Sequence, residues 1–248
     1  MEHPIATIAR IQSQLKSMPL FLGGHRPWNY TEDTSSNVQD PDKINVSVFG
    51  SSLVARLLVF ANTNPMGKEG INPQLNIPGV HVNWCGVPGL KLSRLLHESQ
   101  AGINFTERGM IPFMAARRCE PKMAVCLWGG NDVDNIYVNP ITVSETSITF
   151  ACLFNCLTYV TTILPRPCPT FAHPQDYNVT AQAVNDDLFN KLEVHKNYFP
   201  LVNLWKIRRF DNAAIDLFNE DGVHPNDDGN LRLYHNIRKA VIAGIKKL

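Results

Sequence analysis

Short apolar runs alternate with longer amphipathic segments from residue 44 to the end of the chain, and this alternation constrains the fold more than any other feature. The runs are rich in β-branched residues and too apolar for strands with one face in water, which is typical of a parallel sheet. They lie at residues 44–49, 80–84, 123–128, 158–164 and 199–205. The segments with helical spacing lie at residues 53–62, 90–98, 144–155, 181–196 and 227–247. The sequence therefore predicts an α/β domain in which helices cover both faces of a five-stranded parallel sheet.

The first 43 residues do not follow this alternation. Residues 4–16 place apolar side chains near one helical face, and Pro19 follows soon after, which predicts a short amphipathic helix. Residues 23–43 are rich in polar and turn-forming residues, which predicts a surface loop or tether. We therefore divide the chain into an N-terminal helix and tether, residues 1–43, and one domain, residues 44–248.

Charge and cysteine usage narrow the possible functions. Lys and Arg number 23 against 22 Asp and Glu, so the net charge of +1 gives the whole chain no attraction for nucleic acid or an anionic membrane. No stretch reaches the roughly 20 apolar residues of a membrane span. The N-terminus also lacks the apolar core of a secretory signal, so we expect a cytoplasmic protein. The six cysteines show neither a CxxC pair nor zinc-ligand spacing, so we expect free thiols, no metal and no other cofactor.

The first loop of interest follows the first predicted strand, because ligands of parallel α/β sheets bind at the carboxyl ends of the strands. Gly50, Ser51 and Ser52 come between that strand and a helix. Such a junction can expose a serine hydroxyl beside the backbone N–H groups at the start of a helix, so this serine could act as a nucleophile. A glycine turn followed by a serine N-cap explains the same letters without any catalysis.

Two further loops at this edge can supply hydrogen-bond donors. The third strand ends in Gly-Gly-Asn-Asp at residues 129–132, where glycine lets the backbone approach a ligand and Asn131 can donate to a developing oxyanion. The second strand ends in Asn-Trp-Cys-Gly-Val-Pro-Gly, residues 83–89, which can offer a backbone N–H group. Gly, Asn and Asp are also ordinary turn formers, so a purely structural role stays open for both loops.

A candidate base and its partner lie directly before the last predicted helix. Asp221 precedes His224 by three residues in Asp-Gly-Val-His-Pro-Asn. At that spacing the carboxylate can accept a hydrogen bond from Nδ1 of the ring while Nε2 takes a proton. A glycine turn that happens to carry a histidine is the alternative. The other seven histidines lack a partner at metal-ligand spacing, so we expect no metal site among them.

Taken together, these four segments resemble the SGNH (GDSL-type) hydrolase family in order and spacing. The resemblance covers about residues 44–248 and leaves residues 1–43 unexplained. It implies a three-layer α/β/α, flavodoxin-like fold with sheet order 2-1-3-4-5. It also implies that Ser52 is the nucleophile, His224 the base and Asp221 its partner. The backbone N–H groups of Ser52 and Gly89 and the side chain of Asn131 would form the oxyanion hole.

Two positions depart from the family pattern or leave a choice. Members of this family usually have Asp directly before the nucleophilic serine, whereas this chain has Ser51 at that position. This departure bears on the rate more than on the type of reaction. Gly86 competes with Gly89 for the oxyanion hole, and we favour Gly89 because it ends the Gly-Val-Pro-Gly pattern.

The resemblance implies a metal-independent serine esterase that hydrolyses small acyl esters, such as acetyl esters, through an acyl-enzyme. The expected partner is a small-molecule ester. The main alternative is a catalytically reduced SGNH-like module that binds RNA or another partner. SGNH esterase domains also occur in proteins encoded by some LINE-type retrotransposons, so a link to a retrotransposon-type protein belongs to this alternative. The sequence keeps Ser52, Asn131, Asp221 and His224 together, which favours the enzyme.

Overall fold

Five parallel strands form one sheet in the order β2-β1-β3-β4-β5. In this computed structural model the described residues are 42–64, 66–68, 70–101, 106, 109–135, 137–193, 201–202 and 212–248. The strands are β1 (Ile44–Gly50), β2 (Val80–Gly86), β3 (Met123–Leu127), β4 (Leu157–Thr161) and β5 (Leu201–Val202). The predicted fold class and strand order are therefore confirmed.

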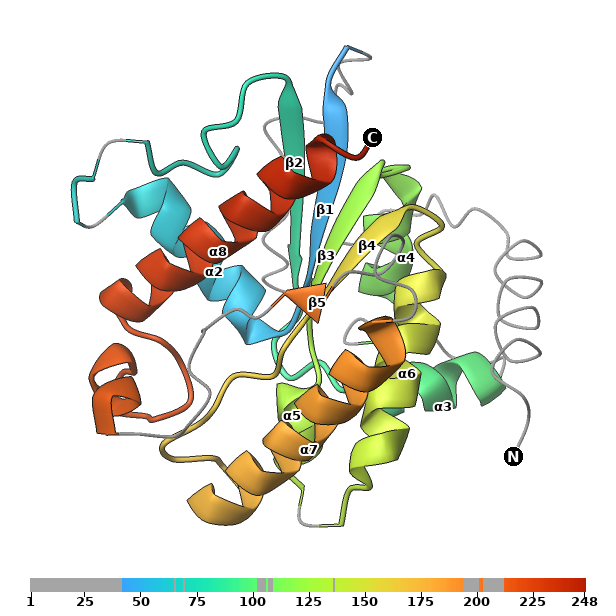
Figure 1. The fold of residues 1–248 in the computed structure, drawn as a ribbon, viewed down its shortest axis with the longest axis vertical. Helices are drawn as coiled ribbons and strands as arrows, with labels where there is room; N and C mark the ends of the chain where they lie inside the picture. The colour runs from blue at the N-terminus through green and yellow to red at the C-terminus, as the bar shows by residue number, and fades with distance from the viewer. Residues whose placement is uncertain are drawn as a thin grey trace.

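Helices cover both faces of the sheet (Figure 1). One face carries α2 (Ser52–Thr63) and α8 (Asp227–Ile245). The other carries α3 (Leu92–Ala101), α4 (Met110–Arg118), α6 (Pro140–Cys152) and α7 (Pro174–Glu193). Two short elements complete the described part of the chain, α5 (Gly130–Val133) and the 3-10 helix η2 (Asn212–Leu217).

Strand β1 shows why both faces are covered. Val46 and Val48 pack against α2 and α8, while Phe49 belongs to the core on the other face, so the strand is apolar on both sides. The ring of Phe49 meets the ring of Phe113 edge to face, with the centroids 5.5 Å apart. This packing fixes the end of β1, from which the chain enters the candidate site.

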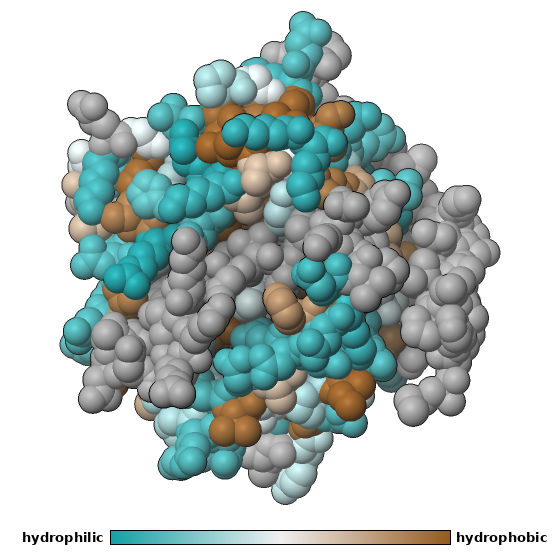
Figure 2. Space-filling model, in the orientation of Figure 1, coloured by the Kyte–Doolittle hydropathy of each residue, from teal (hydrophilic) through white to brown (hydrophobic). Residues whose placement is uncertain are grey.

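On the face shown in Figure 2, hydrophilic residues predominate and hydrophobic residues form separate small groups among them. No helix in the described ranges is both long enough and apolar enough to cross a membrane.

The predicted boundaries differ from the observed ones where local chemistry overrides periodicity. Helices α6 and α7 begin earlier than expected, at Pro140 and Pro174, because proline is well suited to the first turn of a helix. Strand β4 ends at Thr161, so the predicted strand residues 162–164 belong to the loop that follows it. The sequence did not predict α4, α5 or η2. The expected helix at residues 4–16 and most of the last expected strand lie outside the described residues.

Candidate active site

The turn between β1 and α2 requires glycine because three elements meet there. A Cβ atom at Gly50 would lie 2.1 Å from the carbonyl oxygen of Leu127, at the end of β3. Gly86, which pairs with Gly50 in the sheet, is equally restricted: its Cβ would lie 2.2 Å from the backbone nitrogen of Ala55 in α2. These close approaches bring the start of α2 to the carboxyl edge of the sheet.

Two serines follow this turn, and they have different environments. Ser51 occupies the N-cap position of α2 and is buried, but its side chain makes no capping hydrogen bond. Its backbone N–H donates to the carbonyl of Leu127 at 3.0 Å. Ser52 is the first residue of α2, where a backbone N–H has no intrahelical acceptor. Ser52 therefore combines a side-chain hydroxyl with a backbone N–H that has no acceptor within the helix.

A continuous chain of hydrogen bonds joins Ser52, His224 and Asp221. The Ser52 Oγ atom lies 2.9 Å from Nε2 of His224. On the other side of the ring, Nδ1 lies 2.8 Å from Oδ2 of Asp221. The second carboxylate oxygen of Asp221 accepts the backbone N–H groups of Val223 and His224, each at 2.9 Å. The carboxylate is thus held in place while it orients the ring. The structure brings together the three residues predicted as nucleophile, base and partner.

Gly222 shapes the loop that carries the histidine. Its φ of +61° lies in the left-handed region, and a Cβ there would lie 2.3 Å from the Cβ atom of Cys168. The backbone N–H of Cys168 donates to the carbonyl of Gly222 at 3.1 Å. Only glycine combines this backbone conformation with this close approach. The loop after β4 therefore supports the loop that carries His224.

Burial and nearby charges shift the pKa values of Asp221 and His224. Partial burial raises the pKa of Asp221, but the hydrogen bonds from His224 and Val223 outweigh it and hold that pKa at about 2. Burial lowers the pKa of His224 below its usual 6.5, and the positive charges of Arg56 and Arg166 act in the same direction, against the opposing effect of Asp221. The ring is therefore neutral at pH 7 and able to accept a proton.

Asn131 joins the loops that follow β2 and β3. Its Nδ2 donates to the carbonyl of Leu90 at 3.0 Å. The neighbouring Asp132 carboxylate accepts the backbone N–H groups of Leu92 and Ser93 at 2.8 and 2.9 Å, which explains why α3 begins at Leu92. Two consecutive side chains therefore hold the loop that contains Gly89.

Of the two candidate glycines, Gly89 is accessible and Gly86 is not. Gly89 is exposed and has a φ of +72° with open space where a Cβ would be, whereas Gly86 is buried against α2. A left-handed conformation is the reason for glycine at position 89. Close packing is the reason at position 86.

Solved structures share this arrangement of elements, although no protein-family model and no curated protein matches the chain. A GDSL-like lipase from Bacteroides thetaiotaomicron has a TM-score of 0.57 at 17% identity, over 96% of this chain and 98% of its own. The chain has the SGNH hydrolase fold. A carbohydrate esterase family 3 protein from Talaromyces cellulolyticus has a TM-score of 0.54 at 18% identity, over 83% of this chain and 99% of its own. An acetyl esterase variant with an acetate ion has a TM-score of 0.53 at 16% identity, over 82% of this chain and 98% of its own.

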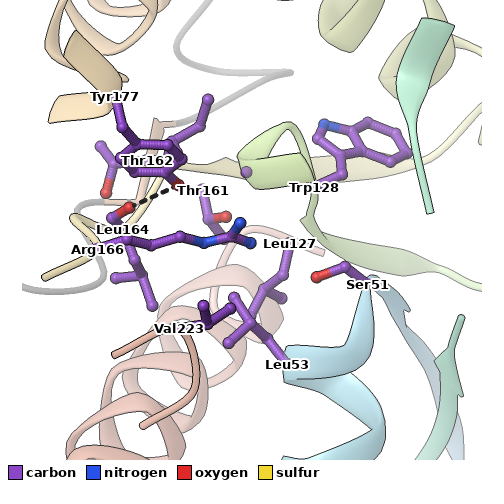
Figure 3. A pocket seen from close by; sticks show the side chains of 12 residues that line it. Ser51, Leu53, Leu127, Trp128, Thr161, Thr162, Leu164, Arg166, Tyr177 and Val223 are labelled. Atoms are coloured by element: carbon purple, nitrogen blue, oxygen red, sulfur yellow. Dashed lines mark hydrogen bonds between the residues drawn. The ribbon is translucent and has the colours of Figure 1, made fainter. Parts of the chain in front are cut away.

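A pocket opens beside the predicted nucleophile, Ser52 (Figure 3). Ser51 and Leu53, on either side of Ser52, line it together with Val223, which precedes His224. Its volume is about 340 Å³ with the open mouth included. The other lining residues come from the ends of β3 and β4 and the loops after them, from α5 and from α7: Leu127, Trp128, Gly130, Thr161, Thr162, Ile163, Leu164, Arg166 and Tyr177.

A buried ion pair that the sequence did not predict lies at this pocket. Arg166 Nη1 donates to Oδ2 of Asp134 at 3.0 Å, and the two side chains are only 5% and 4% exposed. Asp134 also accepts the backbone N–H groups of residues 170–172 at 2.9 to 3.0 Å. Burial raises the pKa of Asp134, but these hydrogen bonds and Arg166 together lower it below its usual value. The sequence carries no local signal that joins the two residues: Asp134 follows strand β3, and Arg166 follows strand β4, 32 residues later.

The described part of the chain offers no group of three or more His, Cys, Asp or Glu side chains that could hold a metal ion. Of the cysteines in it, only Cys168 is exposed. Burial raises the pKa of Cys156 to about 11, so that thiol is protonated at neutral pH.

Proposed function

We propose that this protein is a serine esterase that hydrolyses small acyl esters through Ser52, His224 and Asp221. The observation that carries the proposal is the unbroken hydrogen-bond chain from Ser52 Oγ through the His224 ring to Asp221. A neutral imidazole on a serine hydroxyl, itself oriented by a carboxylate, is the arrangement that activates serine for acyl transfer.

The reaction proceeds in two halves. Ser52 Oγ attacks the carbonyl carbon of the ester while His224 Nε2 takes the hydroxyl proton, and Asp221 stabilises the resulting imidazolium. The tetrahedral intermediate collapses, the C–O bond to the alcohol breaks, and His224 gives its proton to the departing alcohol oxygen. Water then attacks the acyl-enzyme with His224 again as base, which releases the carboxylic acid and restores the Ser52 hydroxyl.

The negative charge of the tetrahedral intermediate needs fixed donors. We assign these to the backbone N–H groups of Ser52 and Gly89 and to the side chain of Asn131. An Asn side chain has two N–H donors, and Leu90 takes one of those on Asn131, which leaves the other for the substrate. The exposed, left-handed Gly89 supports its choice over the buried Gly86.

The pocket favours a short acyl group. The space that Ser51, Leu53 and Val223 help to line is small, about 340 Å³ even with its open mouth included. The fold is similar to that of an acetyl esterase solved with an acetate ion. We therefore propose acetyl esters as the preferred substrates, with a catalytic cycle that needs no metal or other cofactor.

A panel of 4-nitrophenyl esters from acetate to decanoate tests both parts of this proposal. We expect kcat/KM to be highest for acetate and to fall as the acyl chain lengthens. A fluorophosphonate probe should label the wild type and should not label Ser52→Ala. Preference for long chains would contradict the acetyl assignment alone, whereas equal labelling of both proteins would contradict the nucleophile.

A further inference from the structure

Arg166 is the one buried cation of the described residues that contacts a side chain of the candidate oxyanion hole. Its Nη2 donates to Oδ1 of Asn131 at 2.9 Å, while its Nη1 is held by Asp134. The guanidinium also lies over the ring of Tyr177, 5.2 Å from the centroid. In Figure 3 it points into the pocket, toward the end of β3 and Ser51.

The backbone of Arg166 is fixed as firmly as its side chain. Asn178 in α7 accepts the Arg166 backbone N–H through Oδ1 and donates to the Arg166 carbonyl through Nδ2, both at 3.1 Å. The guanidinium has little spare room, because a Cβ at Gly130 would lie 3.1 Å from Nη2. Arg166 is thus a rigid donor with a fixed direction, which suits a residue that positions another.

The two contacts of Asn131 determine how its amide is turned. Arg166 can only donate, so it requires the oxygen of the amide; the Leu90 carbonyl can only accept, so it requires the nitrogen. A turn of the amide by 180° would place donor against donor and acceptor against acceptor. Without Arg166, a single neutral hydrogen bond would hold the orientation. The cation also polarises the amide, which makes the remaining Asn131 N–H a better donor.

We propose that Arg166 is a positioning residue that orients and polarises Asn131 for oxyanion stabilisation. The proposal rests on the proposed function, because it assumes that Asn131 donates to the oxyanion. Loss of Arg166 should then lower kcat and leave KM nearly unchanged, since the oxyanion forms only in the transition state. The loss should also disappear when Asn131 has already been removed.

A double-mutant cycle on 4-nitrophenyl acetate tests this role. Arg166→Met should lower kcat by about 10² with KM within about twofold, which approaches the loss of an oxyanion-hole donor. Arg166→Lys should restore part of the rate. In the Asn131→Ala background, Arg166→Met should lower kcat by less than about a further threefold, because the effects of residues that act as a unit are not additive. Lys191→Met is the matched control, since Lys191 is paired with Asp187 and Glu145 away from the site.

The outcomes separate this proposal from the one on which it rests. Turnover that does not depend on Ser52 would overturn both. Ser52-dependent turnover, with the Arg166 and Asn131 losses multiplying in the double variant, would overturn only the positioning role. A rise in KM at constant kcat would do the same. If Arg166→Met does not melt cooperatively, Arg166→Lys, which keeps a cation opposite Asp134, replaces it in the cycle. Its smaller loss of kcat should likewise disappear in the Asn131→Ala background, and a loss that persists there would overturn the positioning role.

Discussion

The two sides of the candidate site are built in contrasting ways. The proton-transfer side comes from one short loop, in which Asp221 and His224 are three residues apart and have side chains 42% and 17% exposed. The proposed oxyanion side takes its donors from Ser52, Gly89 and Asn131. Behind Asn131, Arg166 contacts Asn131 and Asp134 across 35 and 32 residues of sequence. Its ion pair is almost fully buried.

This difference matches what each side must do. A base must exchange protons with substrate and water, so partial exposure is useful, and its pKa is adjusted by nearby charges. Oxyanion donors act best when they are already oriented and cannot reorganise, which favours a buried and fully hydrogen-bonded frame. Substitutions on the exposed side should therefore change the rate and its pH dependence, whereas those on the buried side should also change stability.

The largest effect is expected where both sides meet, at the nucleophile. Ser52→Ala should lower kcat by on the order of 10³ to 10⁶, with a residual rate from the donors and binding. Ser51→Ala should keep a measurable fraction of the activity, because its hydroxyl lines the pocket but does not contact His224. Equal losses in the two variants, measured on 4-nitrophenyl acetate, would contradict the assignment of the nucleophile.

On the exposed side, Asp221→Asn should lower kcat by up to about 10⁴, since an amide no longer fixes the tautomer or stabilises the imidazolium. Asp221 raises the pKa of His224, so its removal lowers that pKa. The acid limb of the kcat/KM profile should therefore move to lower pH. A limb that stays in place would separate Asp221 from the base.

On the buried side, Asn131→Ala should lower kcat by roughly 10² to 10³ with little change in KM. The reason is that the assigned Asn131 N–H meets negative charge only in the transition state. Steady-state kinetics across pH 6–9 measure both constants. A higher KM at unchanged kcat would instead make Asn131 a ground-state binding residue.

Stability compares the two sides directly. Asp134→Ala should lower the free energy of unfolding by about 3–5 kcal/mol, because it leaves the buried Arg166 charge unpaired. Asp221→Ala removes an exposed partner and should cost about 1 kcal/mol or less. Urea denaturation of both variants gives the two values. Similar losses would mean that the contrast in burial has no energetic consequence.

The same contrast explains how much could be predicted from the sequence. Local spacing points to the loops that carry Ser52, Asn131 and the pair Asp221 and His224: a strand end, a turn, three residues between two side chains. The strand order and the roles of these residues come from the resemblance to the SGNH hydrolases. Arg166 and Asp134 are recognisable only through a contact between two different loops. Neither has a partner at helical or turn spacing, so periodicity could not connect them. The roles of Asp132 in starting α3 and of Gly222 beside Cys168 depend on tertiary contacts in the same way.

The smallest expected effect is a shift of the pH profile caused by Arg56. This exposed side chain lies in α2, one turn after Ser52, with Nη2 4.0 Å from Oδ2 of Asp221. Its charge lowers the pKa of His224, so Arg56→Gln should raise that pKa and move the acid limb to higher pH, opposite to Asp221→Asn. Arg56→Lys keeps the charge and should leave the limb near its wild-type position. Because the contact is exposed, this shift of the acid limb should shrink at high ionic strength. A shift that does not depend on salt would point to a structural change rather than to the charge of Arg56.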